Sequence, residues 1–227
     1  MFTSIARRYD LNNRLHSFGR DQSWRRKAVE LAHVKPSDEV LDAACGTGDL
    51  SLLFAQMGAR RVVGVDFTEA MLELARLKAQ AMVAQRGPTT AAVEFAHADV
   101  TRLPFDHRTF DIVSIAFGLR NVEKPELALR EFRRVMRPGG RLLILEFSTP
   151  PNAIVRAVNR VYTRNIMPLT ASLIAHDRSG AYRYLPRSIE TFPEGEELEE
   201  AVCAAGFARS QRQPLTFGIC AITIGWV

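Results

Sequence analysis

The stretch DAACGTGDLS, residues 42–51, carries two glycines one residue apart behind an aspartate. Gly46 and Gly48 let the main chain approach a ligand closely, because glycine adopts torsions that a Cβ atom disfavours. A glycine pair after a strand can hold a dinucleotide or a phosphate. It can also hold a ligand that has no phosphate, so the pair alone predicts a binding turn without identifying the ligand.

Three aspartates narrow the choice of ligand. Asp42 lies near the end of the first predicted strand, Asp66 ends RVVGVD, and Asp99 lies in AHADV. A carboxylate at Asp42 would repel a pyrophosphate on the turn, so the pattern favours a cationic ligand. Asp99 is placed to accept a hydrogen bond from an adenine amino group. An NAD enzyme stays open, because a dinucleotide site also has an acid about 20 residues after its turn.

The elements around these residues alternate between short apolar runs and helical patterns from Val40 to Phe147. This alternation is typical of βαβ units and a parallel sheet. A helix is predicted from Thr68 to Gly87, and another from Pro125 to the breaker Pro138-Gly139-Gly140, with a strand beginning at Arg141. We expect an α/β, Rossmann-like sheet of seven mostly parallel strands, five of them in the core, ending in an antiparallel hairpin.

We expect one domain over residues 1–227, because the length suits a single well-buried unit. Within it we predict an N-terminal helical cover at 1–35 and a cofactor-binding core at 40–147. A helical insertion that covers the substrate follows at 148–192, and a C-terminal helix and hairpin occupy 193–227.

The composition excludes several classes of protein. No apolar run is long enough to span a membrane and the N-terminus has no secretory signal, so we expect a cytoplasmic protein. The three cysteines have no zinc-ligand or disulfide spacing, so no metal is expected. The net charge of +5 suits an anionic partner. Two arginine clusters supply much of this charge, one N-terminal and one at Arg156, Arg160 and Arg164.

Several strings carry a more specific resemblance: FGLRNV at 117–122, LEFSTP, AYRYLPRSIETFP, LTFGICA and the N-terminal YDLNNRLHSFGRDQSW. They resemble the ubiquinone/menaquinone biosynthesis C-methyltransferase family, especially its demethylmenaquinone branch, within the class I S-adenosylmethionine-dependent methyltransferases. The chain departs from the usual family residues at Asn12, Asp21, Ala116 and Thr223.

The resemblance implies C-methylation of a prenylated quinol with S-adenosyl-L-methionine as cofactor, converting demethylmenaquinol to menaquinol. The benzoquinol step of ubiquinone synthesis and a small-molecule C- or O-methyltransferase are the alternatives. Arg120 and Asn121 are the implied catalytic residues, and Tyr182 and Tyr184 the substrate-binding ones. With the glycine turn, the cofactor-binding residues are Asp42, Gly46, Thr47, Gly48, Asp66, Asp99, Val100 and Ala116.

A prenylated substrate stays in the bilayer, because burial in lipid is worth about 0.8 kcal/mol per methylene. We therefore expect transient contact with an anionic membrane surface at its inner face. Nucleic acid is not expected, because FGLRN stands where exocyclic-amine methyltransferases carry a base-stacking motif. A non-catalytic cofactor-binding scaffold is the non-enzyme alternative, and a homodimer is left open.

Overall fold

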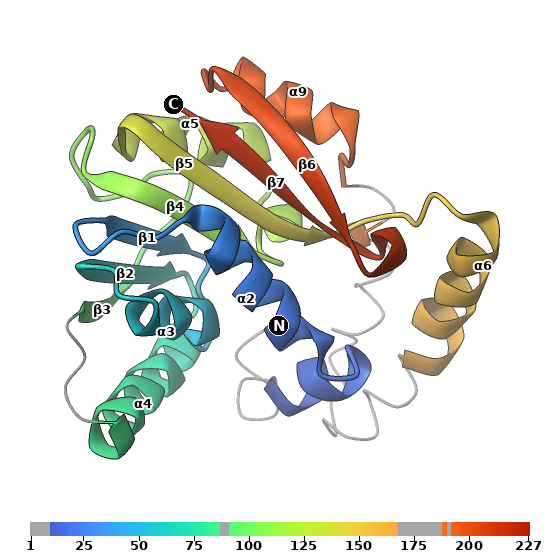
Figure 1. Ribbon diagram of the computed structural model, residues 1–227, viewed down its shortest axis with the longest axis horizontal. Coiled ribbons are helices and arrows are strands. Elements are labelled where there is room, and N and C mark those ends of the chain that lie inside the picture. The colour runs from blue at the N-terminus through green and yellow to red at the C-terminus, as the bar shows by residue number, and fades with distance from the viewer. Residues whose placement is uncertain (1–9, 87–90, 168–187, 190–191) are drawn as a thin grey trace.

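The computed structural model describes residues 10–86, 91–167, 188–189 and 192–227. One mixed sheet has the strand order β3-β2-β1-β4-β5-β7-β6 (Figure 1). The strands are β1 (Glu39–Ala43), β2 (Arg61–Asp66), β3 (Ala92–His97), β4 (Phe110–Ala116), β5 (Met136–Phe147), β6 (Arg209–Leu215) and β7 (Cys220–Trp226).

The strand directions confirm the predicted fold class. β1 to β5 pair in parallel, while β7 pairs antiparallel with both β5 and β6. β6 therefore runs in the same direction as the five core strands, and β7 alone is reversed. The strand order changes direction between β1 and β4, which is where doubly wound sheets bind their ligands.

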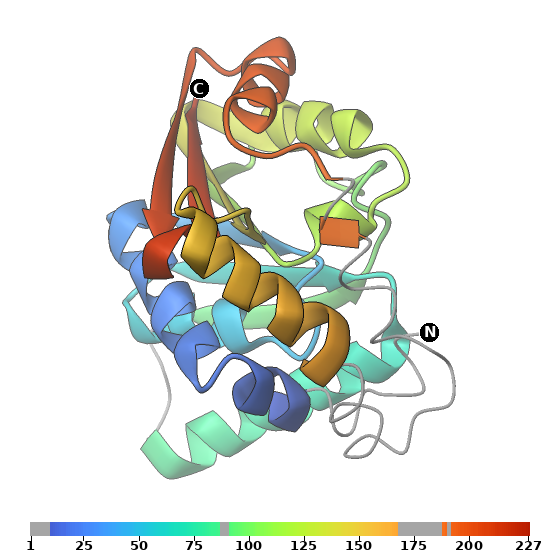
Figure 2. The same ribbon diagram turned by 90° about the vertical axis from the view of Figure 1, so that its right-hand side faces the viewer.

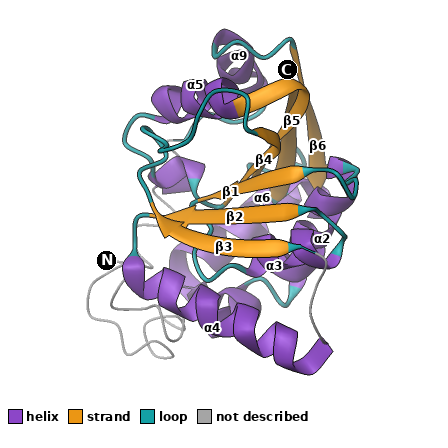
Figure 3. Ribbon diagram, turned by 90° about the vertical axis from the view of Figure 1, so that its left-hand side faces the viewer, coloured by secondary structure: helices purple, strands orange, loops and turns teal. Residues whose placement is uncertain are grey.

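Helices cover both faces of the sheet (Figures 1 and 3). One layer holds α2 (Arg20–Ala32), α3 (Asp49–Gln56) and α4 (Glu69–Arg86), and the other holds α5 (Pro125–Val135) and α9 (Glu196–Ala204). Alternate strand residues face opposite layers, since Val40 packs with α2 and α3 whereas Leu41 packs with α5 and α9. This two-sided burial explains the nearly continuous apolar strands.

The predicted start of β5 was wrong by five residues. β5 begins at Met136, which pairs with Phe110, and the register then shifts so that Arg141 pairs with Ile112. The Pro138-Gly139-Gly140 breaker therefore forms an irregularity inside the strand. Gly140 is required there, because a Cβ would lie 2.9 Å from the carbonyl oxygens of Arg137 and Asp111.

Two helical segments lie outside the layered core. Residues 10–16 are helical and lead into α2. After β5, Asn152 caps α6 (Ala153–Val161) by accepting from the amides of Ile154 and Val155, and a π-helical turn, Tyr162–Ile166, continues it. Viewed from the carboxyl ends of the core strands, α6 lies nearest the viewer (Figure 2). Within the described ranges, no helix has the length and hydropathy needed to cross a bilayer.

Candidate active site

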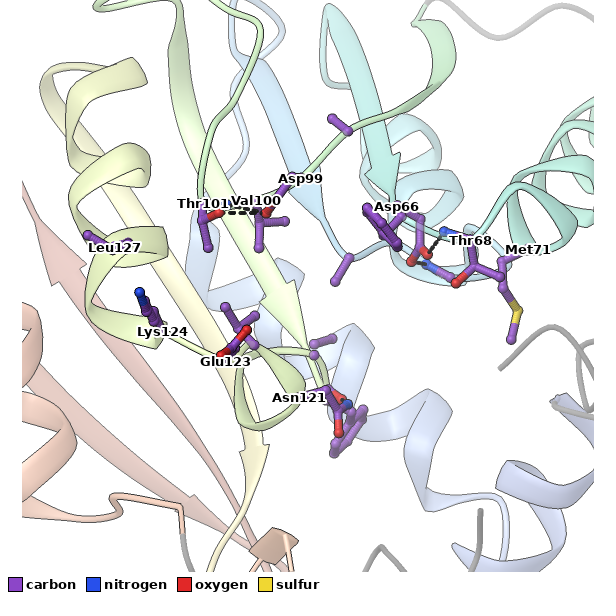
Figure 4. A pocket seen from close by; sticks show the side chains of 18 residues that line it. Asp66, Thr68, Met71, Asp99, Val100, Thr101, Asn121, Glu123, Lys124 and Leu127 are labelled. Carbon is purple, nitrogen blue, oxygen red and sulfur yellow. Dashed lines mark hydrogen bonds between the residues drawn. The ribbon is translucent and has the colours of Figure 1, made fainter. Parts of the chain in front are cut away.

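A cavity of about 550 Å³ opens at the carboxyl ends of β1, β2 and β4 (Figure 4). Six of the predicted site residues line it, and they come from four different connections of the sheet: Gly46, Asp66, Asp99, Val100, Ala116 and Asn121. The structure therefore brings together most of the predicted cofactor residues. Their roles stay predictions.

Asp66 ties two turns of the cavity together. Its Oδ2 accepts a hydrogen bond of 2.8 Å from the Gly46 amide, and its Oδ1 accepts one of 2.8 Å from the Thr68 amide. Figure 4 shows the Thr68 contact at the start of α4. One carboxylate thus fixes the glycine turn and the start of α4 while still facing the cavity.

Asp99 lies on the neighbouring loop after β3. Its Oδ1 accepts hydrogen bonds from the amide and the hydroxyl of Thr101, at 2.8 and 2.7 Å. These bonds, the backbone one first, lower the pKa of Asp99. The carboxylate is therefore a charged acceptor at neutral pH, with Val100 supplying apolar surface beside it.

The glycine turn needs left-handed torsions. Gly46 has φ 55° and Gly48 has φ 80°, and Ala44 before them also has a positive φ of 49°. A Cβ on Gly48 would lie 2.9 Å from the Phe95 ring, so this glycine allows α3 to start close against β3 and α4. Gly48 supports the turn from behind and does not itself line the large cavity.

The N-terminal segment is fastened to this turn. The Thr47 hydroxyl donates to Asp10 at 2.7 Å and accepts from the Lys78 ammonium at 2.8 Å. Lys78 also forms an ion pair of 2.6 Å with Asp10. Thr47 therefore joins the predicted N-terminal cover to the core and lines a small neighbouring cavity of about 30 Å³.

Asp42, predicted to favour a cationic ligand, lies beneath the glycine turn and does not line the large cavity. Asp42 is 1% exposed and lines the small cavity, with its oxygens accepting from Ser51 and Ser114 at 2.6 and 2.8 Å. Burial raises its pKa to about 6, against the opposing hydrogen bonds of the two serines. Asp42 thus links β1, α3 and β4 beneath the turn.

Asp42→Asn is expected to stabilise the fold at high pH. A pKa raised from 3.8 to about 6 means that the folded chain holds the proton more tightly than the unfolded chain. Proton binding at Asp42 therefore adds to the free energy of unfolding fully below about pH 4. This stabilisation, roughly 3 kcal/mol, is lost as the pH rises through 6. Urea titrations should show the variant more stable than the parent at pH 8, with the two converging near pH 4. A less stable variant at pH 8 would contradict this account.

Arg120 does not line the cavity. It lies on the short 3-10 turn η1 (Leu119–Asn121), and its Nη1 contacts Glu146 at 2.7 Å and the Phe117 carbonyl at 2.6 Å. The two side chains of this ion pair are 9% and 4% exposed. Burial raises the pKa of Glu146, and the Arg120 charge opposes that shift. The guanidinium therefore holds the turn from behind, and the catalytic role implied for Arg120 stays a prediction.

Asn121 is the predicted catalytic residue that does line the cavity. Its Nδ2 donates to the same Phe117 carbonyl at 3.2 Å, which fixes the amide orientation. Phe117 has a positive φ of 57°, and its ring packs 4.8 Å from that of Phe147. Arg120 and Asn121 thus hold one strained turn at the end of β4, and Asn121 faces the ligand space from it.

Sequence reasoning missed part of the cavity lining. Phe67 and Thr68 follow Asp66 directly, so the rule that ligands meet the ends of core strands would have found them. Phe67 is 71% exposed and packs against His97, whose Nε2 contacts the Phe67 carbonyl oxygen at 2.9 Å. Three further lining residues have no sequence signal: Met71 on α4, Lys124 just before α5, and Leu127 on α5.

Other predicted positions lie elsewhere. Tyr182 and Tyr184 fall outside the described residues. Of the family departures, Ala116 lines the cavity, whereas Asn12, Asp21 and Thr223 are buried away from it. No group of three or more His, Cys, Asp or Glu side chains suited to a metal occurs among the described residues.

Comparison with known proteins decides the family. The sequence profile of the ubiE/COQ5 methyltransferase family matches residues 1–227. The chain belongs to this family. Relatives similar to it include the demethylmenaquinone methyltransferase of Thermus thermophilus, 48% identical over 226 residues, or 99% of each chain. The resemblance drawn from the motifs is therefore confirmed.

A second relative is the ubiquinone/menaquinone biosynthesis C-methyltransferase UbiE of Idiomarina loihiensis. It is 41% identical over 228 residues, covering 100% of this chain and 88% of the relative. A solved SAM-dependent methyltransferase from Aquifex aeolicus shares the fold, with a TM-score of 0.66 at 18% identity over 96% of this chain and 97% of that one. This ubiE/COQ5 family member is thus a methyltransferase with the class I fold.

Proposed function

We propose that this chain methylates a ring carbon of a prenylated quinol, most specifically demethylmenaquinol to menaquinol, with S-adenosyl-L-methionine as donor. One observation carries the proposal. The cavity joins two acidic strand ends to the Asn121 turn in a chain that matches the ubiE/COQ5 family along its whole length.

The residues of the cavity fit the proposed cofactor. Asp66 would accept from ribose hydroxyls and Asp99 from the adenine amino group, while Val100 and Phe67 supply apolar surface for the ring. Gly46 and Ala116 also line the cavity, where their small size would let a ligand come close to the main chain. A cationic sulfonium is compatible with a cavity that carries these two carboxylates. When bound, the cofactor supplies an electrophilic methyl group.

The chain's own task is to hold an electron-rich ring in line with that methyl group. A hydroquinone becomes a carbon nucleophile as it loses a hydroxyl proton. Aligning two reactants can lower a barrier by about 7–11 kcal/mol, so orientation and exclusion of water are sufficient main contributions. We assign the ring to the part of the cavity bordered by Asn121 and Lys124, with the Arg120–Glu146 pair holding the Asn121 turn rigid.

The prenyl tail places the reaction at a membrane. A long isoprenoid chain partitions into lipid, so the enzyme has to reach the quinol at the bilayer surface. We propose transient contact with an anionic leaflet at its inner face by an otherwise cytoplasmic protein. The net charge of +5 supports such contact, because each basic residue near an anionic leaflet contributes about 1 kcal/mol.

A labelled-donor assay tests the function. The protein is incubated with labelled S-adenosylmethionine and chemically reduced demethylmenaquinol, the corresponding demethylated benzoquinol, and simple phenols. We expect carbon methylation of the naphthoquinol, identified by mass fragmentation. Preference for the benzoquinol would move the assignment to ubiquinone synthesis. Methylation of oxygen, or of the simple phenols alone, would instead support a small-molecule methyltransferase and overturn the proposal.

A further inference from the structure

Helix α6 exposes an apolar stripe along its whole length. Ile154, Val158 and Val161 recur at helical spacing and are 75%, 65% and 54% exposed. None of the residues in α6 is buried. A helix in a globular protein normally buries its apolar side, so this one is built to contact something outside the fold.

A second apolar stripe lies beside the first. Leu11, Leu15 and Phe18 are 52%, 48% and 78% exposed on the N-terminal segment. The Phe18 ring packs 5.6 Å from that of Tyr162, whose hydroxyl donates to the His16 carbonyl at 3.1 Å. The Tyr162 contacts therefore join the two segments into one surface, which we call the α6 surface.

The α6 part of this surface carries only basic charge. Residues 153–166 contain three arginines and no aspartate or glutamate. Arg160 is exposed on α6, and on the N-terminal segment the Arg14 side chain is 54% exposed, with Asp49 4.0 Å away. Helices that lie in a lipid interface combine an apolar face with basic residues beside it, and aromatic rings gather at the headgroup level. The α6 surface has all three features.

We infer that the α6 surface docks this protein on an anionic lipid bilayer, with Ile154, Val158, Val161 and Phe18 entering the interface and Arg160 meeting the headgroups. α6 lies on the side where the core strands end, which is also the side of the cavity (Figures 1 and 2). Docking there would bring the cavity to the lipid that holds the substrate. This inference extends the proposed membrane substrate, although docking itself needs no turnover.

Vesicle co-sedimentation tests the docking surface without any methyl acceptor. The full chain is mixed at low salt with vesicles of phosphatidylglycerol and phosphatidylcholine, or of phosphatidylcholine alone. We expect binding to the anionic vesicles, weakened more than about tenfold by Ile154→Asp with Val158→Asp, since losing the burial of two methylenes already gives that factor. Arg160→Glu should weaken anionic binding about tenfold or more.

A matched control lies on α4. Leu77 and Val83 are 60% and 45% exposed there, and α4 is remote from α6 in Figure 1. Leu77→Asp with Val83→Asp changes the net charge by the same amount and should change vesicle binding less than twofold. Equal losses for the two double variants would show a general charge effect and overturn the inference.

The other occupant to exclude is a second copy of this chain. Sedimentation velocity on the parent and on the α6 double variant measures the oligomeric state. A dimer that the α6 variant splits while vesicle binding persists would assign the surface to self-association and overturn docking. A parent chain that methylates a short-chain quinol but ignores anionic vesicles refutes docking alone, whereas one that binds vesicles and methylates no quinol refutes the proposed function alone.

Discussion

Arg120→Ala is expected to lower turnover about 100-fold while cofactor affinity changes little. That factor is typical when a mutation away from the reacting atoms misplaces a site group by about 1 Å. Here the guanidinium holds Glu146 and the Phe117 carbonyl, and so fixes the turn that carries Asn121. Steady-state kinetics on the reduced quinol, with calorimetric titration of S-adenosylmethionine, measures both quantities. Full turnover in the variant would reject a functional role for Arg120.

Arg120→Ala is also expected to lower the free energy of unfolding. This loss has to be distinguished from a direct effect on turnover. Removing one partner of a buried ion pair costs about 3–5 kcal/mol, because the other charge stays buried and unpaired. The double variant Arg120→Gln with Glu146→Gln replaces the ion pair by two neutral amides that can still hydrogen-bond and that leave no unpaired charge. It should recover most of the unfolding free energy in urea titrations. If its turnover also recovers, the arginine acts only through stability.

Asp66→Ala is expected to weaken S-adenosylmethionine binding about 10- to 100-fold. A hydrogen bond to a charged group is worth roughly 1.5–3 kcal/mol, and Asp66 is the proposed ribose acceptor. The variant also releases the Gly46 and Thr68 amides, so the turn around the cofactor loses its anchor. Calorimetric titration at one salt concentration measures the change, and unchanged affinity would remove the assignment.

Glu69→Ala provides the matched control for Asp66. Glu69 also lies at the start of α4, its side chain is 53% exposed, and it pairs with Arg76 at 2.6 Å outside the cavity. Removing it changes the net charge equally but takes nothing from the ligand space. We expect less than a twofold change in affinity. A similar loss in both variants would indicate a long-range charge effect in place of a direct contact.

The residues that sequence reasoning placed well are those whose position depends on local order. The glycine turn and Asp99 lie just after strands, and Asp66 ends one; parallel strands bring their carboxyl ends to one edge of the sheet. Their convergence therefore follows from the strand pattern alone. The same logic placed the helix from Glu69 to Arg86, with Thr68 before it.

The surroundings that sequence reasoning did not foresee depend on contacts between residues far apart in the chain. Asp42 meets Ser114, 72 residues away on β4, and Arg120 meets Glu146, 26 residues away on β5. Sheet register decides both contacts, and one sequence does not reveal register. For Arg120 this meant that a residue expected to contact the substrate lies behind the turn. The predicted start of β5 was wrong for a different reason. The Pro138-Gly139-Gly140 breaker is a local signal for the end of an element, but pairing with β4 continues the strand across it.

The position of β7 between β5 and β6 determines when the last strands can join the sheet during synthesis. β6 leaves the ribosome before β7, yet in the described sheet β6 pairs only with β7, and β7 separates it from β5. Until the residues through Trp226 have emerged, β5 keeps an open edge and β6 has no place in the sheet. An unpaired apolar edge recruits other chains, so nascent molecules of this protein are prone to aggregation until β7 has emerged.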